Sequence, residues 1–410
     1  MTGRPERARL APAPPSRFRL PRRSSGVLDQ GERELALGHA RALIEAPTAP
    51  YCEDGPYALV EEFARSHPGF ELERDEHANL LVTWKGTRKR AKSEPLLALS
   101  AHLDHPAFHY AGKRGGRHQA RLAGGVPARF LPGARLRFFE AGGESEALAT
   151  ARIARVLRTA DESVRVELEH FAGRARRGMF GVFDLPSGTI RGGRLHARVC
   201  DDLMGAAAIL STLQMCARAG IERPLLGIFT RAEETGFVGC LGLLKSGALP
   251  AGTQVVGLEC SPRRSTARVG RGPVIRVGDK QSIFDPELTL ELEEAARTLT
   301  ERVPGFRFQR ALMDGGSCES TAYNHFGTRA AAVCLALGNY HNCGPDGRIA
   351  PEFVGWDDYE GLVALLFELA RGSGKASPRA KIEARLQRIW EREYNLLSTS
   401  SRRLRRGEKR

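Results

Sequence analysis

Residues 96–104 read LLALSAHLD, and this stretch indicates the fold of the chain. Its first five residues form a short apolar run, which predicts a buried strand. The strand leads directly into His102 and Asp104, residue types that bind metal ions or orient their ligands. Open α/β folds place their ligand site at the carboxyl ends of the strands, so we expect this pair at such an edge.

Outside this stretch, predicted helices alternate with predicted strands. Helical periodicity predicts helices over residues 32–46, 56–66, 202–219, 286–302, 320–326 and 359–370. Compact apolar runs predict strands over residues 79–84, 225–230, 253–259 and 330–337. Buried strands separated by helices indicate an α/β fold with a mixed, mostly parallel sheet.

Residues 110–196 have a different pattern. Short β-rich pieces alternate there with glycine-rich turns, and no long helical pattern occurs. We therefore expect a small β-barrel or β-sandwich domain inserted in the chain. The main domain would then comprise residues 31–109 and 197–371.

Charge is concentrated in the two tails. The chain of 410 residues has a formal net charge of +14. Residues 1–30 hold seven arginines and two acidic residues, and residues 375–410 hold twelve lysines or arginines and four glutamates. We expect residues 1–30 to be a disordered basic tail. Residues 372–410 are expected to form a linker followed by a basic C-terminal helix and tail.

The predicted C-terminal helix, residues 378–397, carries apolar residues at helical spacing, and we expect that face to pack on the protein or on a second subunit. No apolar run approaches the roughly 18 residues of a membrane-spanning helix, so we expect no membrane partner. The arginine-rich end at residues 402–406 indicates nucleic acid only weakly. Eight cysteines without a C-x-x-C pair favour reduced thiols and a cytoplasmic protein.

Ligand-type residues also follow the other predicted strands or begin the next helix: Asp201-Asp202, Glu233-Glu234, Glu259 and His341. Each of these alone has a simpler explanation, such as a helix cap, a solvated surface or a structural histidine. Their common position at one edge of the predicted sheet favours a shared site.

Two histidines and three carboxylates form a mixed nitrogen and oxygen ligand set that suits zinc, cobalt or manganese. Five ligands are too many for one closed site, whereas two ions bridged by one carboxylate would use all of them. Adjacent Glu233 and Glu234 can serve one site only beyond the end of a strand, because side chains alternate faces within it. One would bind metal, and the other would take a proton from the attacking water.

This ordered set resembles the di-metal aminopeptidases of the glutamyl aminopeptidase and deblocking (tetrahedral) aminopeptidase family, within the zinc-exopeptidase superfamily. The resemblance covers roughly residues 35–371 and is carried by Ala78-Asn79-Leu80, Ala101-His102-Leu103-Asp104, Cys200-Asp201-Asp202-Leu203-Met204-Gly205, Ala232-Glu233-Glu234-Thr235-Gly236, Gly257-Leu258-Glu259 and Gly315-Gly316-Ser317. It implies a three-layer zinc-exopeptidase-like core and a homo-oligomer, either a dimer or a larger assembly.

By position, the resemblance assigns one metal ion to His102, Asp201 and Glu259. It assigns the second ion to Asp201, Glu234 and His341, so that Asp201 bridges the two. Zinc is the expected metal, with cobalt or manganese as alternatives.

The resemblance implies three further features of the site. Glu233 would act as the general base, and Asp104 would orient His102. The peptide bond between Asp201 and Asp202 would be cis.

Two segments depart from the family pattern. The run Gly315-Gly316-Ser317-Cys318-Glu319 lacks the Asp that usually follows Gly-Gly-Thr. The last histidine lies in Asn339-Tyr340-His341-Asn342-Cys343 rather than in the commoner His-Ser-Pro context. These positions lie near the substrate in relatives, so the departures concern the substrate class and not metal binding.

The sequence therefore predicts a metal-dependent aminopeptidase that removes N-terminal residues from peptides. The long interval between Asp104 and Asp201 favours this branch, because the carboxypeptidase and deacylase branch typically inserts its lid domain later. A metal-dependent carboxypeptidase or N-acyl-amino-acid amidohydrolase on the same core is the alternative. A non-catalytic scaffold, or a nucleic-acid-associated protein acting through the basic tails, is the alternative from another class.

Overall fold

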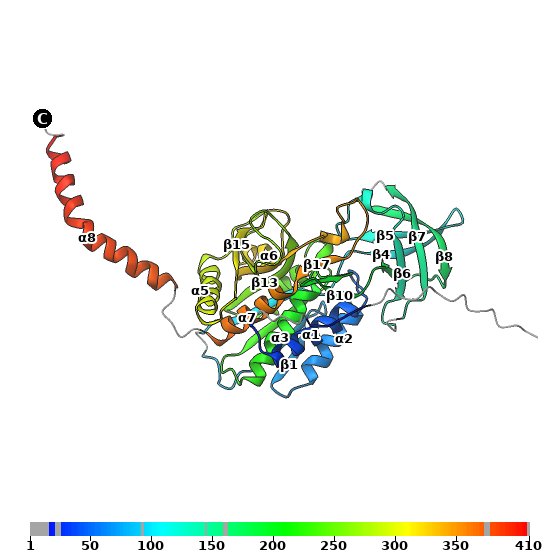
Figure 1. Ribbon diagram of the computed structural model, residues 1–410, viewed down its shortest axis with the longest axis horizontal. Helices are drawn as coiled ribbons and strands as arrows, with labels where there is room; N and C mark the ends of the chain where they lie inside the picture. The colour runs from blue at the N-terminus through cyan, green and yellow to red at the C-terminus, as the bar shows by residue number, and fades with distance from the viewer. Residues whose placement is uncertain are drawn as a thin grey trace, which may run out of the picture.

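The computed structural model describes residues 16–20, 26–91, 94–143, 146–158, 163–372 and 378–407. An eight-stranded sheet forms the centre of the main body (Figure 1). In spatial order its strands are β1 (Phe70–Arg74), β2 (Leu80–Trp84), β12 (Leu225–Thr230), β3 (Leu96–His102), β13 (Thr253–Pro262), β16 (Arg329–Leu337), β14 (Val274–Gly278) and β15 (Gln309–Leu312).

The four central strands of this sheet are parallel. β12 pairs with β3, β3 with β13, and β13 with β16, all in parallel register. The antiparallel pairs β2·β12 and β14·β16 flank them. The prediction of a mixed, mostly parallel sheet is therefore confirmed, and the carboxyl ends of the four central strands meet at one edge.

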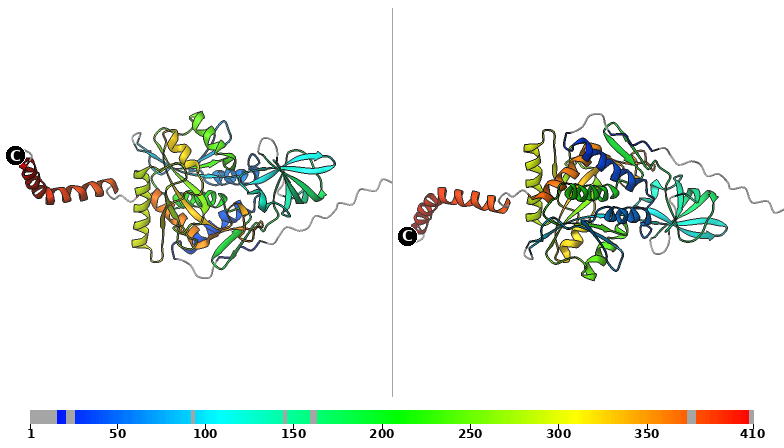
Figure 2. Two further views of the ribbon diagram at one scale, coloured as in Figure 1. Left: turned by 90° about the horizontal axis from the view of Figure 1, so that it is seen from above. Right: turned by 90° about the horizontal axis from the view of Figure 1, so that it is seen from below.

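Helices cover both faces of the sheet (Figure 2). One face packs against α1 (Gln30–Glu45), α2 (Asp54–Arg65), α3 (Leu203–Arg218), α5 (Pro286–Arg302) and α7 (Trp356–Arg371), and the other against α4 (Val238–Ser246) and α6 (Glu319–His325). Each strand contributes side chains to both helical layers, because successive side chains point to opposite faces of the sheet. Leu99 and Val256 pack in the first layer, whereas Ala98 and Val255 pack in the second.

A separate barrel projects from one end of this body (Figure 1). It closes in the order β4-β5-β8-β7-β6-β9, with bounds β4 (Ala107–Arg114), β5 (Arg117–Ala123), β6 (Arg135–Glu140), β7 (Ala149–Arg158), β8 (Val164–Gly173) and β9 (Met179–Phe183). It has its own core, which includes Phe108, Phe138 and Val166. The inserted small domain is thus a barrel and not a sandwich.

The predicted insertion extends further along the chain than the barrel does. β10 (Gly188–Arg191) and β11 (Arg194–Ala197) pair with β17 (Glu352–Gly355) in a three-stranded sheet, outside the barrel. Short strands inside the barrel and short strands outside it look alike in sequence, because the sequence does not show which strand each of them pairs with.

Part of the N-terminal tail is ordered. Arg17 exchanges backbone hydrogen bonds with Gly188 and Ile190, and Phe18 and Leu20 pack against the main core. The expected disorder is therefore wrong for residues 16–20 and also for residues 26–30, where Leu28 is buried in the core and Asp29 caps α1, while residues 1–15 and 21–25 lie outside the described residues.

The C-terminal helix α8 (Pro378–Gly407) extends away from the body at the end opposite the barrel (Figure 1). Of the linker and tail predicted around it, residues 373–377 and 408–410 lie outside the described residues. Among the helices that the structure describes, none combines the length and the apolar character needed to cross a membrane.

Candidate active site

Four neighbouring parallel strands bring the predicted site residues to one edge of the sheet. β3 ends at His102, and β13 carries Glu259 near its end. β12 is followed by the short helix η2 (Glu233–Thr235), and β16 by η3 (Tyr340–Asn342). The remaining residue, Asp201, precedes α3. Residues spread over most of the chain thus converge at the position that the parallel sheet favours.

The converging side chains form groups that could hold metal ions. Within each group the potential ligand atoms lie within 4.8 Å of one another. The groups are His102, Asp201 and Glu259; Asp201, Glu234 and His341; and His102, Glu233 and Glu234. The first two share Asp201 and contain the same residues as the two ligand sets that the family resemblance implied.

Both imidazoles present Nε2 to the centre of the site. His102 Nδ1 lies 3.1 Å from the carbonyl oxygen of Asp104, and His341 Nδ1 lies 2.8 Å from that of Gly125. Because a carbonyl only accepts, each Nδ1 carries a proton, so that Nε2 is the nitrogen that could bind a metal ion. The two Nε2 atoms lie 3.6 Å and 3.7 Å from the two carboxylate oxygens of Asp201.

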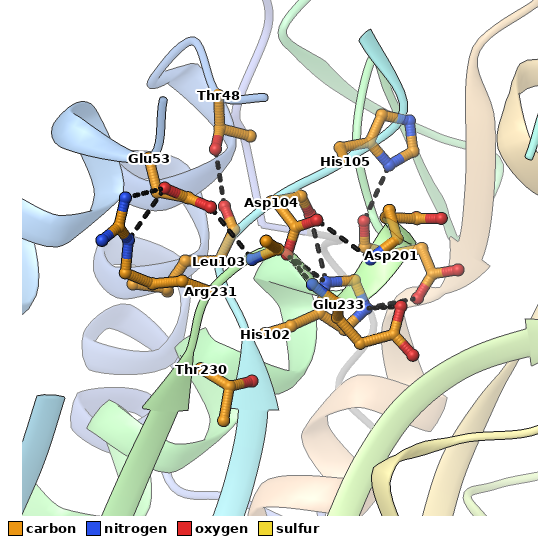
Figure 3. Close-up of polar contacts among 12 residues, drawn as sticks. Thr48, Glu53, His102, Leu103, Asp104, His105, Asp201, Thr230, Arg231 and Glu233 are labelled. Atoms are coloured by element: carbon orange, nitrogen blue, oxygen red, sulfur yellow. Dashed lines mark hydrogen bonds and ion pairs between the residues drawn. The ribbon is translucent and has the colours of Figure 1, made fainter. Parts of the chain in front are cut away.

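Asp104 fixes the turn that carries the two adjacent glutamates (Figure 3). Its carboxylate accepts hydrogen bonds from the backbone N–H of Glu233 at 2.9 Å and of Glu234 at 3.0 Å. The same carboxylate lies 3.5 Å from His102 Nδ1. Asp104 is fully buried, so its negative charge is satisfied by these donors rather than by water.

Glu53 supports the same turn from the other side (Figure 3). It accepts a hydrogen bond from the backbone N–H of Ala232 at 3.0 Å and pairs with Arg231 at 2.9 Å. Sequence reasoning missed Glu53, which lies just before α2 without any strand end to mark it.

Glu352, on β17, connects the segment that carries Asp201 with the segment that carries His341. It accepts hydrogen bonds from the backbone N–H groups of Cys200 at 2.7 Å, Asp201 at 3.2 Å and His341 at 2.8 Å. His105 adds a further contact, since its Nδ1 lies 2.8 Å from the carbonyl oxygen of Asp201. The sequence analysis did not single out either residue, although His105 directly follows the His-x-Asp stretch.

The peptide bond between Asp201 and Asp202 is cis, as the resemblance implied. Asp201 is buried, and its carboxylate faces the two imidazoles while its backbone is held by Glu352 and His105. A residue held in this way is well placed to be shared between two ligand groups.

Burial and the charges of neighbouring groups together determine the protonation of the site. It raises the pKa of Glu259 to about 8, and the charge of Asp201 adds to the rise. Burial also raises the pKa of Glu233 well above its usual value, with Glu259 and Glu234 adding to the effect. Burial acts to lower the pKa of His341, but Glu234 and Asp201 raise it to about 10. Carboxylates crowded in this way favour a bound cation or proton at their centre.

The donor set fits a pair of divalent metal ions. Nitrogen and carboxylate oxygen ligands suit zinc and its neighbours. The Oε1 atom of Glu234 is buried without a hydrogen-bond partner among the described residues, and it lies 3.3 Å from His341 Nε2. A cation between these atoms would satisfy an oxygen that the protein itself leaves unpaired.

A pocket opens next to Glu259. Its lining includes Arg264, Arg276, Tyr340 and residues 315–317. Both segments that depart from the family pattern therefore contribute to it. Arg276 is buried and donates a hydrogen bond to Ser261, and with the more exposed Arg264 it gives the pocket a positively charged lining.

Comparisons with known proteins agree with this geometry. The family model of the M42 glutamyl aminopeptidases matches residues 79–345. No curated protein sequence matches the chain. Among solved structures, the aminopeptidase APDkam598 from the archaeon Desulfurococcus kamchatkensis is similar with a TM-score of 0.67 and 20% identity, covering 85% of this chain and 96% of that chain.

Two further structures share the fold. The Pyrococcus horikoshii TET1 peptidase, which can assemble into a tetrahedron or a large octahedral shell, has a TM-score of 0.65 and 20% identity over 82% of this chain and 99% of its own. A TET aminopeptidase from a marine sediment Thaumarchaeota archaeon has a TM-score of 0.65 and 18% identity over 82% and 96%. The family match spans more than half of the chain and includes all seven predicted site residues, with His341 near its end. The chain belongs to the M42 glutamyl aminopeptidase family and is a metal-dependent aminopeptidase.

Proposed function

We propose that the chain hydrolyses the bond after the N-terminal residue of peptides at a site for two zinc ions, with cobalt or manganese as alternative metals. The observation that carries this proposal is the pair of ligand groups that share Asp201. His102 and Glu259 would complete one group, and Glu234 and His341 the other. Two ions held by these residues would polarise the scissile carbonyl and lower the pKa of the attacking water.

Glu233 is the proposed general base. It belongs to the same turn as Glu234, and its carboxylate lies 3.9 Å from His102 Nε2 at the centre of the site. Burial raises its pKa well above the usual value, which makes its carboxylate a stronger base than an exposed one. Glu233 would take a proton from the attacking water and return it to the leaving amine.

Asp104 is proposed to act through its neighbours and not on the substrate. Its two hydrogen bonds to the backbone of Glu233 and Glu234 hold the base and a ligand in one rigid turn. Its carboxylate beside Nδ1 of His102 adds to the orientation of that imidazole.

The pocket next to Glu259 is proposed to receive the side chain of the N-terminal residue. Arg264 and Arg276 line it, and guanidinium groups bind carboxylates with two parallel hydrogen bonds. An acidic first residue is therefore the expected preference.

We also propose a cytoplasmic homo-oligomer, either a dimer or a larger assembly. All eight cysteines are free thiols, which supports a reducing compartment. The TET1 peptidase with the same fold assembles into closed shells, which supports self-association of this chain.

A panel of aminoacyl-p-nitroanilides tests the proposed activity. Glutamyl and aspartyl substrates are expected to be released faster than leucyl or lysyl ones, and a chelator is expected to stop release until zinc, cobalt or manganese is restored. The same substrate with an acetylated amine is expected to resist cleavage. Cleavage of the acetylated substrate, or of peptides from their carboxyl end, would overturn the aminopeptidase assignment in favour of an amidohydrolase or carboxypeptidase.

A further inference from the structure

Helix α8 presents an apolar face that nothing in the described structure covers. At 3.6 residues per turn, one side of the helix gathers the exposed residues Ile382, Leu386, Ile389, Trp390, Tyr394, Leu396, Leu397 and Leu404. Trp390 is 51% exposed and lies beside the ring of Tyr394, with 4.8 Å between the ring centroids. The sequence-based expectation that this face packs on the body of the same chain is therefore wrong.

A cationic stripe runs along the helix beside this apolar face. Lys381, Arg385, Arg388 and Arg392 recur at spacings of four, three and four residues and so share one side of the helix. Lys381 pairs with Glu294 on α5 and Arg392 pairs with Glu393.

Five cations of α8, including two from this stripe, form no ion pair among the described residues. They are Arg385, Arg388, Arg402, Arg403 and Arg405, and all five are exposed. An apolar face flanked by unpaired cations matches a surface that is itself apolar and negatively charged.

A second copy of the helix fits this face poorly. An antiparallel pair that matches Ile382 with Leu404 would place Glu393 against its own counterpart at the centre. A parallel pair that buried the same face would place Glu393, which lies on that face between Ile389 and Leu397, opposite its counterpart. Like charges would therefore meet in either orientation.

A nucleic acid also fits less well. Phosphates would pair with the arginines, but they would leave aliphatic side chains such as Leu386 and Leu397 in water. We propose that α8 binds a membrane surface of anionic phospholipids, with its apolar face at the level of the acyl chains and its cations among the headgroups. This departs from the expectation of no membrane partner, which depended on the absence of a membrane-spanning segment.

The placement of α8 agrees with this role. Its first turn is joined to α5 by the pairs Arg379–Glu287, at 2.7 Å, and Lys381–Glu294. The rest of the helix extends from the body at the end opposite the barrel (Figures 1 and 2). The helix can therefore lie on a flat surface without the body covering its apolar face.

Co-sedimentation of the full chain with vesicles tests the proposal. We expect binding to vesicles of equal parts phosphatidylcholine and phosphatidylglycerol, little binding to pure phosphatidylcholine, and weaker binding as salt increases. The double variant R385Q/R388Q is expected to bind the anionic vesicles about thirtyfold more weakly, which corresponds to about 1 kcal/mol for each cation. The control K113Q/R114Q, which removes the same charge from the barrel, is expected to bind like the parent chain.

Trp390 provides a second readout. The other two tryptophans, Trp84 and Trp356, are buried, so a shift of fluorescence to shorter wavelength on anionic vesicles reports Trp390. L386S/W390S is expected to lose binding, whereas T399A, on the side away from the apolar face, is expected to keep it. Release of aminoacyl-p-nitroanilides by each variant checks that the body is folded.

Three results would overturn the proposal. One is the absence of binding to anionic vesicles at low salt. Another is equal binding by R385Q/R388Q and K113Q/R114Q. The third is α8-dependent binding to polyuridylate, or α8-dependent self-association in analytical ultracentrifugation, without vesicle binding.

Discussion

Asp104 and Glu352 each hold backbone amides beside the proposed metal ligands. Asp104 accepts from the turn of Glu233 and Glu234, and Glu352 accepts from Asp201 and from the segment after β16. The convergence of the proposed ligands was predictable from the sequence, because metal chemistry restricts ligands to a few residue types and these residues follow strand ends. The role of Glu352 was not, because a buried acceptor of amide hydrogens has no sequence signal until the fold brings the segments together.

Replacing Glu233 with Gln separates proton transfer from metal binding. The amide keeps the shape of the side chain but cannot take a proton, so kcat is expected to fall by a factor of about 10² to 10⁴. Metal content, measured by mass spectrometry of the purified chain, is expected to stay at the parent level. The exposed Glu222 changed to Gln serves as the control. Loss of metal in Glu233→Gln would show that this residue is a ligand and not the base.

Arg264 tests the proposed specificity pocket. Its side chain is 42% exposed and lies 3.6 Å from Asp314, so a substrate carboxylate can reach it. In Arg264→Gln, kcat/KM for a glutamyl substrate is expected to fall about ten- to a hundredfold relative to a leucyl substrate, the loss expected for a charged hydrogen bond. The exposed Arg268 changed to Gln is the control. An equal fall for both substrates would place Arg264 outside the specificity pocket.

Secondary structure elements were predictable where a pattern was strong. The helix predicted over residues 286–302 is the observed α5, and each predicted strand has its counterpart in the central sheet. Helix α4 was missed because its sequence, VGCLGLLKS, is apolar nearly throughout and shows no periodicity. β17 and its partners β10 and β11 were missed because four-residue strands depend on pairing across distant parts of the chain.

Strand β17 positions two ligand segments through Glu352. A Gln at this place offers one oxygen where the carboxylate offers two, so one backbone N–H loses its acceptor and faces an amide group instead. Glu352→Gln is expected to weaken zinc binding about ten- to a hundredfold, measured by competition with a chromophoric chelator. The exposed Glu76 changed to Gln is the control. Unchanged affinity would mean that β17 does not position the ligands.

His39 makes the packing of α1 on α3 dependent on pH. Burial, followed by the charge of Arg218, lowers its pKa from 6.5 to about 4, and its Nδ1 lies 3.1 Å from Ser211 Oγ. The folded chain therefore favours the neutral imidazole. Its contribution to stability is complete above the unfolded pKa of 6.5 and is lost as the pH falls from there toward 4.

Replacing His39 with Gln should remove that dependence. The free energy of unfolding, measured in urea, is expected to fall in the parent chain as the pH goes from about 7.5 to about 5. In His39→Gln this fall is expected to be smaller by up to about 2 kcal/mol. The exposed His67 changed to Gln is the control. A parent-like pH dependence in His39→Gln would contradict the assignment.

The whole molecule combines a parallel sheet that forms the site with a barrel inserted between Asp104 and Asp201. The interval and the change in pattern at residue 110 predicted the insertion, because a β-rich segment without helices cannot continue an α/β sheet. The extent of the insertion and the ordered N-terminal strap at residues 16–20 were not predictable. Both depend on pairing with β10, which only the folded chain brings into place.

Five side chains from four strand ends and the start of α3 are proposed to form one site for two metal ions. The measurement that tests it most directly is the metal content of the whole chain after saturation with zinc and dialysis, determined by mass spectrometry for the parent chain and Asp201→Ala. The account predicts about two ions per parent chain and loss of both in the variant, because Asp201 is the shared ligand. A parent chain that retains no metal, or a variant that retains two ions, would contradict it.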